Sequence, residues 1–158
     1  MEDAFLIEKS TRYDIKGKRY ISTPYKYYFE DLGLRNARLD FRQYEPTHLL
    51  ENLIYNELRI RQYNVDVGVV VANSKDENNR SVRSMLEVDF VCNKGSERLY
   101  VQSAYALPDA EKLRQESRSL ELTKDTFQKI IITNDLVPTY QTDSGIKVMN
   151  VFDFLLGR

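Results

Sequence analysis

Two strand-like segments joined by a short turn constrain the fold of this chain more than any other feature. Both segments, residues 85–92 and 98–106, have the composition of strands. Residues 86–90 alternate apolar and acidic side chains, and residues 100–104 place Tyr100, Gln102 and Ala104 on one face, as a β-strand with two different faces requires. Only the turn signal Asn-Lys-Gly-Ser at residues 93–96 separates them. The two segments are therefore expected to pair as an antiparallel hairpin, with Cys92 opposite Glu97.

The segments around this hairpin alternate between helical and strand patterns. Leu50, Ile54 and Leu58 recur at helical spacing within residues 46–62, where Pro46 suits the first turn and Thr47 suits the cap. The order of elements from there predicts an α/β fold, in which helices flank a mixed sheet. The other elements are expected at residues 65–71 (strand), 108–120 (helix), 129–133 and 146–149 (strands) and 151–156 (helical turn).

The first 44 residues have a different character and predict a β-rich extension to a main domain at residues 45–158. Tyrosine-rich extended segments lie on both sides of the turn signal Lys-Gly-Lys at residues 16–18, which indicates a hairpin. Residues 33–44 are expected to be a connector. Polar surface loops are expected at residues 73–83, which read as mobile, and at residues 134–145.

Composition excludes some classes of protein. The chain has 158 residues, and none of its apolar runs approaches the roughly 20 residues that span a bilayer, so no membrane partner is expected. It opens with Met-Glu-Asp rather than a signal-like segment, and its single cysteine, Cys92, permits no internal disulfide. These features predict a cytoplasmic location. A net charge of −1 argues against nucleic-acid binding driven by bulk charge, although a local basic patch remains open.

Tyrosines and basic residues of the first 30 positions are a candidate for such a patch. Tyrosine rings can stack on bases, while lysine and arginine side chains contact phosphate. Packing within a sheet explains the same tyrosines more simply. The residues concerned are Tyr20, Tyr25, Tyr27 and Tyr28, with Lys16, Lys18, Arg19 and Lys26.

The central hairpin also gathers oxygen-bearing side chains. With Cys92 opposite Glu97, Asp89 faces Tyr100 and Gln102 faces Glu87. A carboxylate beside a second oxygen ligand can hold Mg²⁺ or Mn²⁺, and Glu51 on the preceding helix could add a further acid. The alternative is that Glu87 and Asp89 form only the solvated face of a strand. One side of the hairpin would collect Glu87, Asp89, Tyr100, Gln102 and Ala104.

Three motifs in this order resemble the PD-(D/E)XK nucleases: HLLEN at residues 48–52, EVDF at residues 87–90 and YVQSAY at residues 100–105. Three more stretches, at residues 12–18, 26–36 and 151–156, make the chain similar to the C-terminal domain of a large family of prokaryotic AAA-type ATPases. The resemblance implies a restriction-endonuclease-like mixed sheet flanked by helices. It implies a site for Mg²⁺ or Mn²⁺ at Glu51, Asp89 and Gln102, and an ATPase module in the same full-length protein.

The third motif departs from the nuclease pattern. It requires an acid, a spacer and a lysine, and this chain has Gln102, Ser103 and Ala104. Lys112 is the candidate for a relocated lysine, although a solvated helix-face lysine explains it more simply. Other chemistry-bearing residues also have structural explanations: His48 as a capping or packing residue, Cys92 as a buried apolar residue, and Arg59 and Arg61 as a solvated helix face.

Three functions are compatible with these features. The first is a non-catalytic accessory domain of an AAA-type ATPase, which mediates nucleic-acid or protein contacts through a degenerate site. The second is an active metal-dependent nuclease that uses Glu51, Asp89 and Gln102. The third is an oligomerisation module in which residues 19–29 pair edge to edge between two copies of the chain. The retained motifs together with the missing lysine favour the first function. The sequence contains no phosphate-binding loop of the G-x-x-x-x-G-K-[ST] type, so this chain itself is not expected to bind or hydrolyse ATP in that way.

Overall fold

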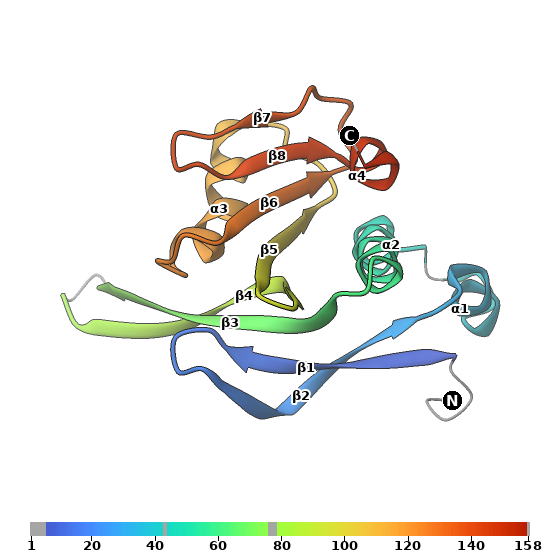
Figure 1. Ribbon diagram of the computed structural model, residues 1–158, viewed down its shortest axis with the longest axis horizontal. Helices are drawn as coiled ribbons and strands as arrows, with labels where there is room; N and C mark the ends of the chain where they lie inside the picture. Colours follow the sequence, from blue (N-terminus) through green and yellow to red (C-terminus); the bar gives the residue numbers. More distant parts are fainter. Residues whose placement is uncertain (1–5, 43, 76–78, 158) are drawn as a thin grey trace.

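A computed structural model describes residues 6–42, 44–75 and 79–157 and shows one eight-stranded sheet with the order β2-β1-β3-β4-β5-β6-β8-β7 (Figure 1). The strands are β1 (Ile7–Asp14), β2 (Arg19–Phe29), β3 (Asn64–Lys75), β4 (Ser81–Lys94), β5 (Glu97–Ala104), β6 (Gln128–Thr133), β7 (Tyr140–Gln141) and β8 (Lys147–Asn150). The helices are α1 (Leu32–Arg38), α2 (Pro46–Ile60), α3 (Ala110–Glu121) and α4 (Val151–Leu156).

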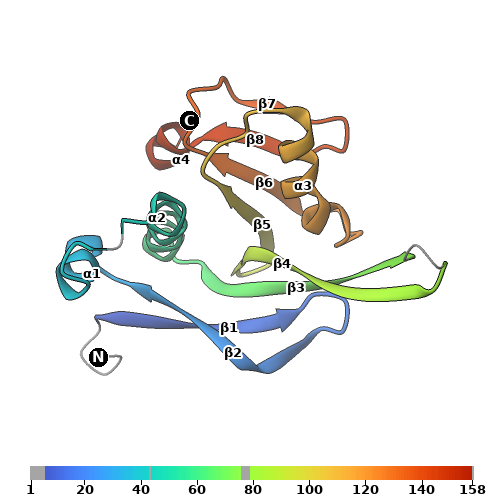
Figure 2. The ribbon, with the colours of Figure 1, turned by 180° about the vertical axis from the view of Figure 1, so that it is seen from behind.

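The sheet is mixed, which confirms the predicted α/β class. Strands β3, β4 and β5 form an antiparallel meander, whereas β5, β6 and β8 run parallel. Helix α2 covers one face of the sheet and α3 covers the other, as both ribbon views show (Figures 1 and 2). Among the described residues, no helix is long and apolar enough to cross a membrane.

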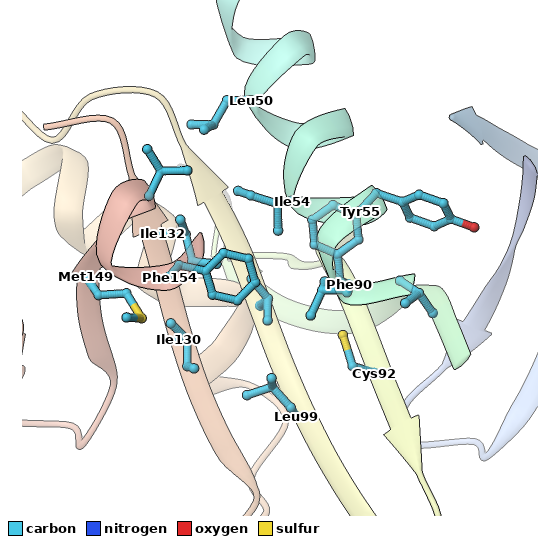
Figure 3. Packing of buried hydrophobic residues seen from close by; sticks show 14 of the residues in the cluster. Leu50, Ile54, Tyr55, Phe90, Cys92, Leu99, Ile130, Ile132, Met149 and Phe154 are labelled. Carbon is cyan, nitrogen blue, oxygen red and sulfur yellow. The ribbon is translucent and has the colours of Figure 1, made fainter. Parts of the chain in front are cut away.

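Helix α2 forms where the leucine and isoleucine spacing predicted it, because Leu50, Ile54 and Leu58 all point into the core. They pack with Phe90 of β4 and with Phe154 of α4 (Figure 3). The helix begins at Pro46 as predicted, but its N-cap is Glu45 rather than Thr47, and no side chain caps it. On the opposite face, Leu120 of α3 packs against a second apolar cluster that includes Tyr100, Ile131 and Val148.

The predicted N-terminal hairpin is present as β1 and β2. Strand β1 also pairs in parallel with β3, so the hairpin belongs to the same sheet as the rest of the chain. Residues 1–5, at the start of the predicted extension, lie outside the described residues. The division of the chain at residue 44 stays a prediction.

Three of the predicted connecting segments contain regular structure that the sequence did not predict. In the segment 134–145 it is the short strand β7, which pairs antiparallel with β8. The segment 33–44 contains most of α1, whose N-cap Asp31 accepts a hydrogen bond from the Leu34 amide at 2.8 Å. A seven-residue helix is too short to show a clear periodicity, which is why the pattern missed it. In the segment 73–83, β3 continues to Lys75 and β4 starts at Ser81, although the sequence is almost entirely polar. Residues 76–78 lie outside the described part.

Candidate functional site

The predicted register of the β4–β5 hairpin is wrong by two residues. Cys92 pairs with Leu99 rather than Glu97, and Lys94 pairs with Glu97. The turn therefore contains only two residues, of which Gly95 has a φ of +59° that glycine adopts without strain. A shift of two residues preserves the face of every side chain, so this error alone leaves the predicted grouping intact.

A β-bulge in β4 does change the grouping. The pairing of β3 with β4 shifts between Asp66–Val91 and Gly68–Val88, so Asp89 and Phe90 both lie opposite Val67. As a result, Val88 joins the apolar cluster under α3 while Phe90 joins the one under α2. The bulge thereby turns the Asp89 carboxylate toward α2, into the field of Glu51 and Lys26.

Gln102 faces the other way, which corrects the prediction that it shares a side with Asp89. Its Oε1 accepts a hydrogen bond from Ser119 of α3 at 3.3 Å, and its Nε2 lies 3.5 Å from Glu116 Oε2. Gln102 contacts Asp89 only through the Asp89 backbone amide, at 3.3 Å. Tyr100 and Ala104 also pack on the α3 side. The structure therefore brings Glu51 and Asp89 together and separates Gln102 from them.

Lys26 of β2 lies at the centre of the acidic residues. Its Nζ is 2.8 Å from Glu51 Oε1 and 2.5 Å from Glu87 Oε1. The Tyr28 hydroxyl donates to the same Glu51 oxygen at 2.7 Å, and Arg12 Nη1 lies 2.6 Å from Glu87 Oε2. Lys26, Glu51, Glu87 and Asp89 are called the Lys26 cluster below.

The electrostatics of the Lys26 cluster are those of a partly buried site. Burial and the neighbouring Glu51 carboxylate raise the pKa of Asp89 to about 7, although Lys26 and a hydrogen bond from the Ser103 amide oppose the rise. Burial alone would lower the pKa of Lys26, but its contacts with Glu51 and Glu87 outweigh burial and raise it. Lys26 is therefore a permanent cation, whereas Asp89 titrates near neutral pH.

These residues do not fit the expected Mg²⁺ or Mn²⁺. The ammonium group of Lys26 already holds an oxygen of Glu51 and one of Glu87, and Gln102 is turned to the opposite face. Within the described ranges, no group of three or more His, Cys, Asp or Glu side chains is placed to hold a metal ion. Within the Lys26 cluster, the place where a cation would contact two carboxylates is taken by the Lys26 ammonium group.

Sequence reasoning placed Lys26 only in the candidate basic patch and missed its contacts with Glu51 and Glu87, because these partners come from distant parts of the chain. The relocated lysine that the sequence suggested, Lys112, instead forms an ion pair at 2.6 Å with Glu116 on its own helix. The sequence gives one local indication of the site: Lys26 and Tyr28 are two residues apart in a strand, so their side chains lie on the same face. That signal does not show which helix the face meets.

The remaining candidates have structural roles. His48 is exposed and its Nδ1 lies 2.7 Å from Glu45 Oε2, while Cys92 is buried, as predicted. Arg59 and Arg61 are not merely solvated, because Arg59 pairs with Glu8 of β1 and Arg61 donates to the Phe154 carbonyl. They tie α2 to its neighbours. Of the four tyrosines, Tyr28 is buried and stacks on Tyr55, whereas Tyr20, Tyr25 and Tyr27 are exposed.

Asn52 fixes the strand that carries Lys26 to the helix that carries Glu51. Its Oδ1 accepts from the Phe29 amide at 2.8 Å and its Nδ2 donates to the Phe29 carbonyl at 2.7 Å. Asn52 is buried, and Phe29 ends β2 three residues after Lys26. The Asn52 side chain thus makes the two backbone hydrogen bonds with Phe29 that a neighbouring strand would otherwise make.

We expect Asn52→Ala to lower the free energy of unfolding by about 1–3 kcal/mol, because it leaves the Phe29 amide without this partner. Urea denaturation measures the change. The matched control is Asn56→Ala, since Asn56 donates to the Phe29 and Glu30 carbonyls but accepts nothing from the Phe29 amide. Equal losses in the two variants would contradict a special role for Asn52.

Comparison with known proteins gives one informative match. No protein-family profile and no solved structure matches the chain. The chain is similar to an uncharacterized protein of Haemophilus influenzae, with 37% identity over 156 residues. The match covers 99% of this chain and 35% of that protein, so the chain spans about a third of the length of the relative.

Proposed function

We propose that this chain is a nuclease-like accessory domain that contacts nucleic acid without cleaving it, within a protein that also carries an AAA-type ATPase module. The order α2, β3-β4-β5 meander, α3 and β6 agrees with the restriction-endonuclease-like fold that the motifs imply. Most of the Haemophilus relative lies outside the match, which leaves room in that protein for a second module.

One observation carries the non-cleaving part of the proposal: the Lys26 ammonium group bridges Glu51 and Glu87. A catalytic Mg²⁺ at the expected site would need the Glu51 carboxylate, which Lys26 holds, to help activate water and neutralise charge on a phosphate. An internal ammonium group neutralises the carboxylates but has no open coordination position for water. The Lys26 cluster therefore keeps the acids of a nuclease site and uses them as an ion-pair network.

The nucleic-acid part of the proposal is supported by the β1–β2 hairpin. Its turn carries Lys16, Lys18 and Arg19, all exposed, next to the exposed ring of Tyr20. Basic groups beside an aromatic ring suit contact with phosphate and base together. Because the whole chain has a net charge of −1, contact is expected to be local and to weaken as salt rises.

We expect no cleavage of single- or double-stranded DNA by the purified chain in Mg²⁺ or Mn²⁺ buffers, because the cluster lacks an open metal position. Gel electrophoresis of labelled strands measures cleavage, and calorimetry with Mn²⁺ measures metal binding. Cleavage that disappears in both Asp89→Asn and Lys26→Met would replace this proposal with an active nuclease, in which Lys26 serves as the missing lysine.

A further inference from the structure

A row of aromatic and cationic side chains crosses the sheet on its α3 side. Arg98 of β5 lies in the middle of the row, with its guanidinium carbon 5.4 Å from the ring centre of Tyr13 and 5.5 Å from that of Phe127. Tyr13 packs against the apolar cluster under α3, and the ring centre of Tyr20 lies 5.4 Å from that of Tyr13. Tyr20, Tyr13, Arg98 and Phe127 are called the Arg98 row below.

Three parts of the chain that are distant in sequence build the Arg98 row. Tyr13 and Tyr20 are paired across the β1–β2 hairpin. Arg98 lies at the start of β5, and Phe127 directly precedes β6. Both ribbon views show the β1–β2 turn and the loop between α3 and β6 on the same side of the molecule (Figures 1 and 2). The row therefore continues from the basic β1–β2 turn into the body of the sheet.

Arg98 carries a positive charge that no carboxylate neutralises by direct contact. Its Nε donates to Asn93 Oδ1 at 2.8 Å, and it forms no ion pair with any acid in the described part of the chain. A guanidinium group has five N–H donors in a flat fork that matches the oxygens of a phosphate. Arg98 therefore has the charge and the donors to bind an anion.

The two acids that contact the row are already engaged by other groups. Asp66 accepts hydrogen bonds from Thr11 at 2.5 Å and from Tyr20 at 3.2 Å. Asp125 accepts from the Tyr100 hydroxyl at 2.6 Å and lies 3.4 Å from Lys129 Nζ. These contacts hold both carboxylates away from Arg98. The basic turn next to Tyr20 adds further positive charge, from Lys16, Lys18 and Arg19.

Exposed rings on both sides of Arg98 select the kind of anion. Tyr20 is 65% exposed and Phe127 is 41% exposed, so both rings have surface available for stacking. An acidic protein segment would match the charge of Arg98 but would leave these rings unused. A nucleic acid matches both features, since its phosphates bind guanidinium and its bases stack on aromatic rings. In a duplex the faces of the bases are covered by their neighbours, so the rings favour unpaired bases.

We propose that the Arg98 row binds a single strand of nucleic acid, with the Arg98 guanidinium on a phosphate and the rings of Tyr20 and Phe127 against two unpaired bases. The inference rests on the proposed function and names the partner as single-stranded. The basic β1–β2 turn contacts further phosphates at the Tyr20 end of the row.

The test measures fluorescence anisotropy of a labelled mixed-sequence DNA strand of about 12 nucleotides, of an abasic strand of the same length and of the matching duplex. Arg98→Gln is expected to weaken binding of the normal strand about 5-fold and to reduce the slope of log affinity against log salt by about 0.7, the effect of one lost phosphate contact. Phe127→Ala is expected to weaken binding about 10-fold without changing this slope, and to leave binding of the abasic strand unchanged.

Two matched controls remove the same groups from other elements. Arg61→Gln removes an arginine that also lies beside a ring, 4.4 Å from the ring centre of Phe154, but that is paired with Glu57 on α2. Phe152→Ala removes a ring that is 55% exposed on α4. Each control should change affinity by less than about 2-fold, because long-range effects of single surface groups are screened by salt. Thermal melting shows whether each variant is folded.

Photocrosslinking to the unmodified chain gives a readout that does not depend on any variant. A strand that carries 5-iodouracil is expected to label the peptides that contain Tyr20 and Phe127. Crosslinks at neither residue overturn the inference, even where a variant fails to fold.

The other outcomes separate this inference from the proposed function. Unchanged affinity and salt slope in folded Arg98→Gln and Phe127→Ala overturn the row and leave the proposed function standing. Duplex binding as tight as that of the single strand overturns the assignment of an unpaired partner. Displacement by a polyglutamate peptide as effective as that by an unlabelled strand overturns the inference in favour of an acidic protein segment. If no strand binds at low salt, both proposals are overturned.

Discussion

Replacement of Lys26 by methionine is expected to lower the free energy of unfolding by about 2–4 kcal/mol at pH 7. Methionine fills much of the same volume but leaves Glu51 without its cation beside the buried Asp89 carboxyl, whereas Glu87 keeps Arg12 as a partner. Removing one partner of a buried ion pair costs about 3–5 kcal/mol, and partial exposure reduces that cost here. The side chains of Lys26 and Glu51 are 27% and 14% exposed. Urea denaturation followed by circular dichroism measures the change.

Two variants test whether charge compensation is the cause. Lys112→Met removes a lysine from an i,i+4 pair within one helix, in which Lys112 is 38% and Glu116 15% exposed, and is expected to cost about 0.5 kcal/mol, as such helix pairs typically do. The double variant Lys26→Met with Glu51→Gln is expected to regain at least half of the loss, because Glu87 keeps Arg12 as a partner. If the double variant is no more stable than Lys26→Met, the lysine stem rather than its charge holds the cluster together.

The periodic parts of the fold could be predicted from the sequence, and the site could be predicted only in part. Helix α2 follows from the helical spacing of Leu50, Ile54 and Leu58, and strands β4 and β5 follow from residues that alternate between two faces, because burial of one face imposes these patterns. Glu51 and Asp89 were recognised for the same reason, since each lies in a strongly patterned element.

The arrangement of the site depends on two features that leave no periodic signal. The bulge at Asp89 and Phe90 reverses the face of everything before it in β4, so pattern reading placed Gln102 beside Asp89 when it faces α3. The position of Lys26 depends on the packing of β2 against α2, a contact between residues 25 positions apart in sequence. Single-sequence patterns describe faces within an element but not which elements meet.

The stability of the chain is expected to fall as pH rises from about 4 to 7, and Asp89 is the reason. Its pKa is about 7 in the folded chain and near its ordinary value of 3.8 in the unfolded chain, so the folded state binds the extra proton between these values. Stability from this group is therefore fully present below pH 4 and is lost as pH rises through 7. A pKa difference of this size can change the free energy of unfolding by at most about 4 kcal/mol.

Asp89→Asn isolates this contribution, because the asparagine oxygen can still accept the hydrogen bond from the Ser103 amide while the titration disappears. The variant should be the more stable protein by about 1–4 kcal/mol at pH 8, and the difference should vanish near pH 4.

Glu8→Gln provides a control, because the contribution of Glu8 to stability changes with pH in the opposite direction. Burial would raise the pKa of Glu8, but hydrogen bonds from Tyr55 and Arg59 lower it, so Glu8 stabilises the fold above pH 4.5 and loses that effect in acid. Urea midpoints at pH 4, 6 and 8 measure both differences, and an Asp89→Asn variant that is less stable at pH 8 would show that the charged carboxylate is needed by the fold.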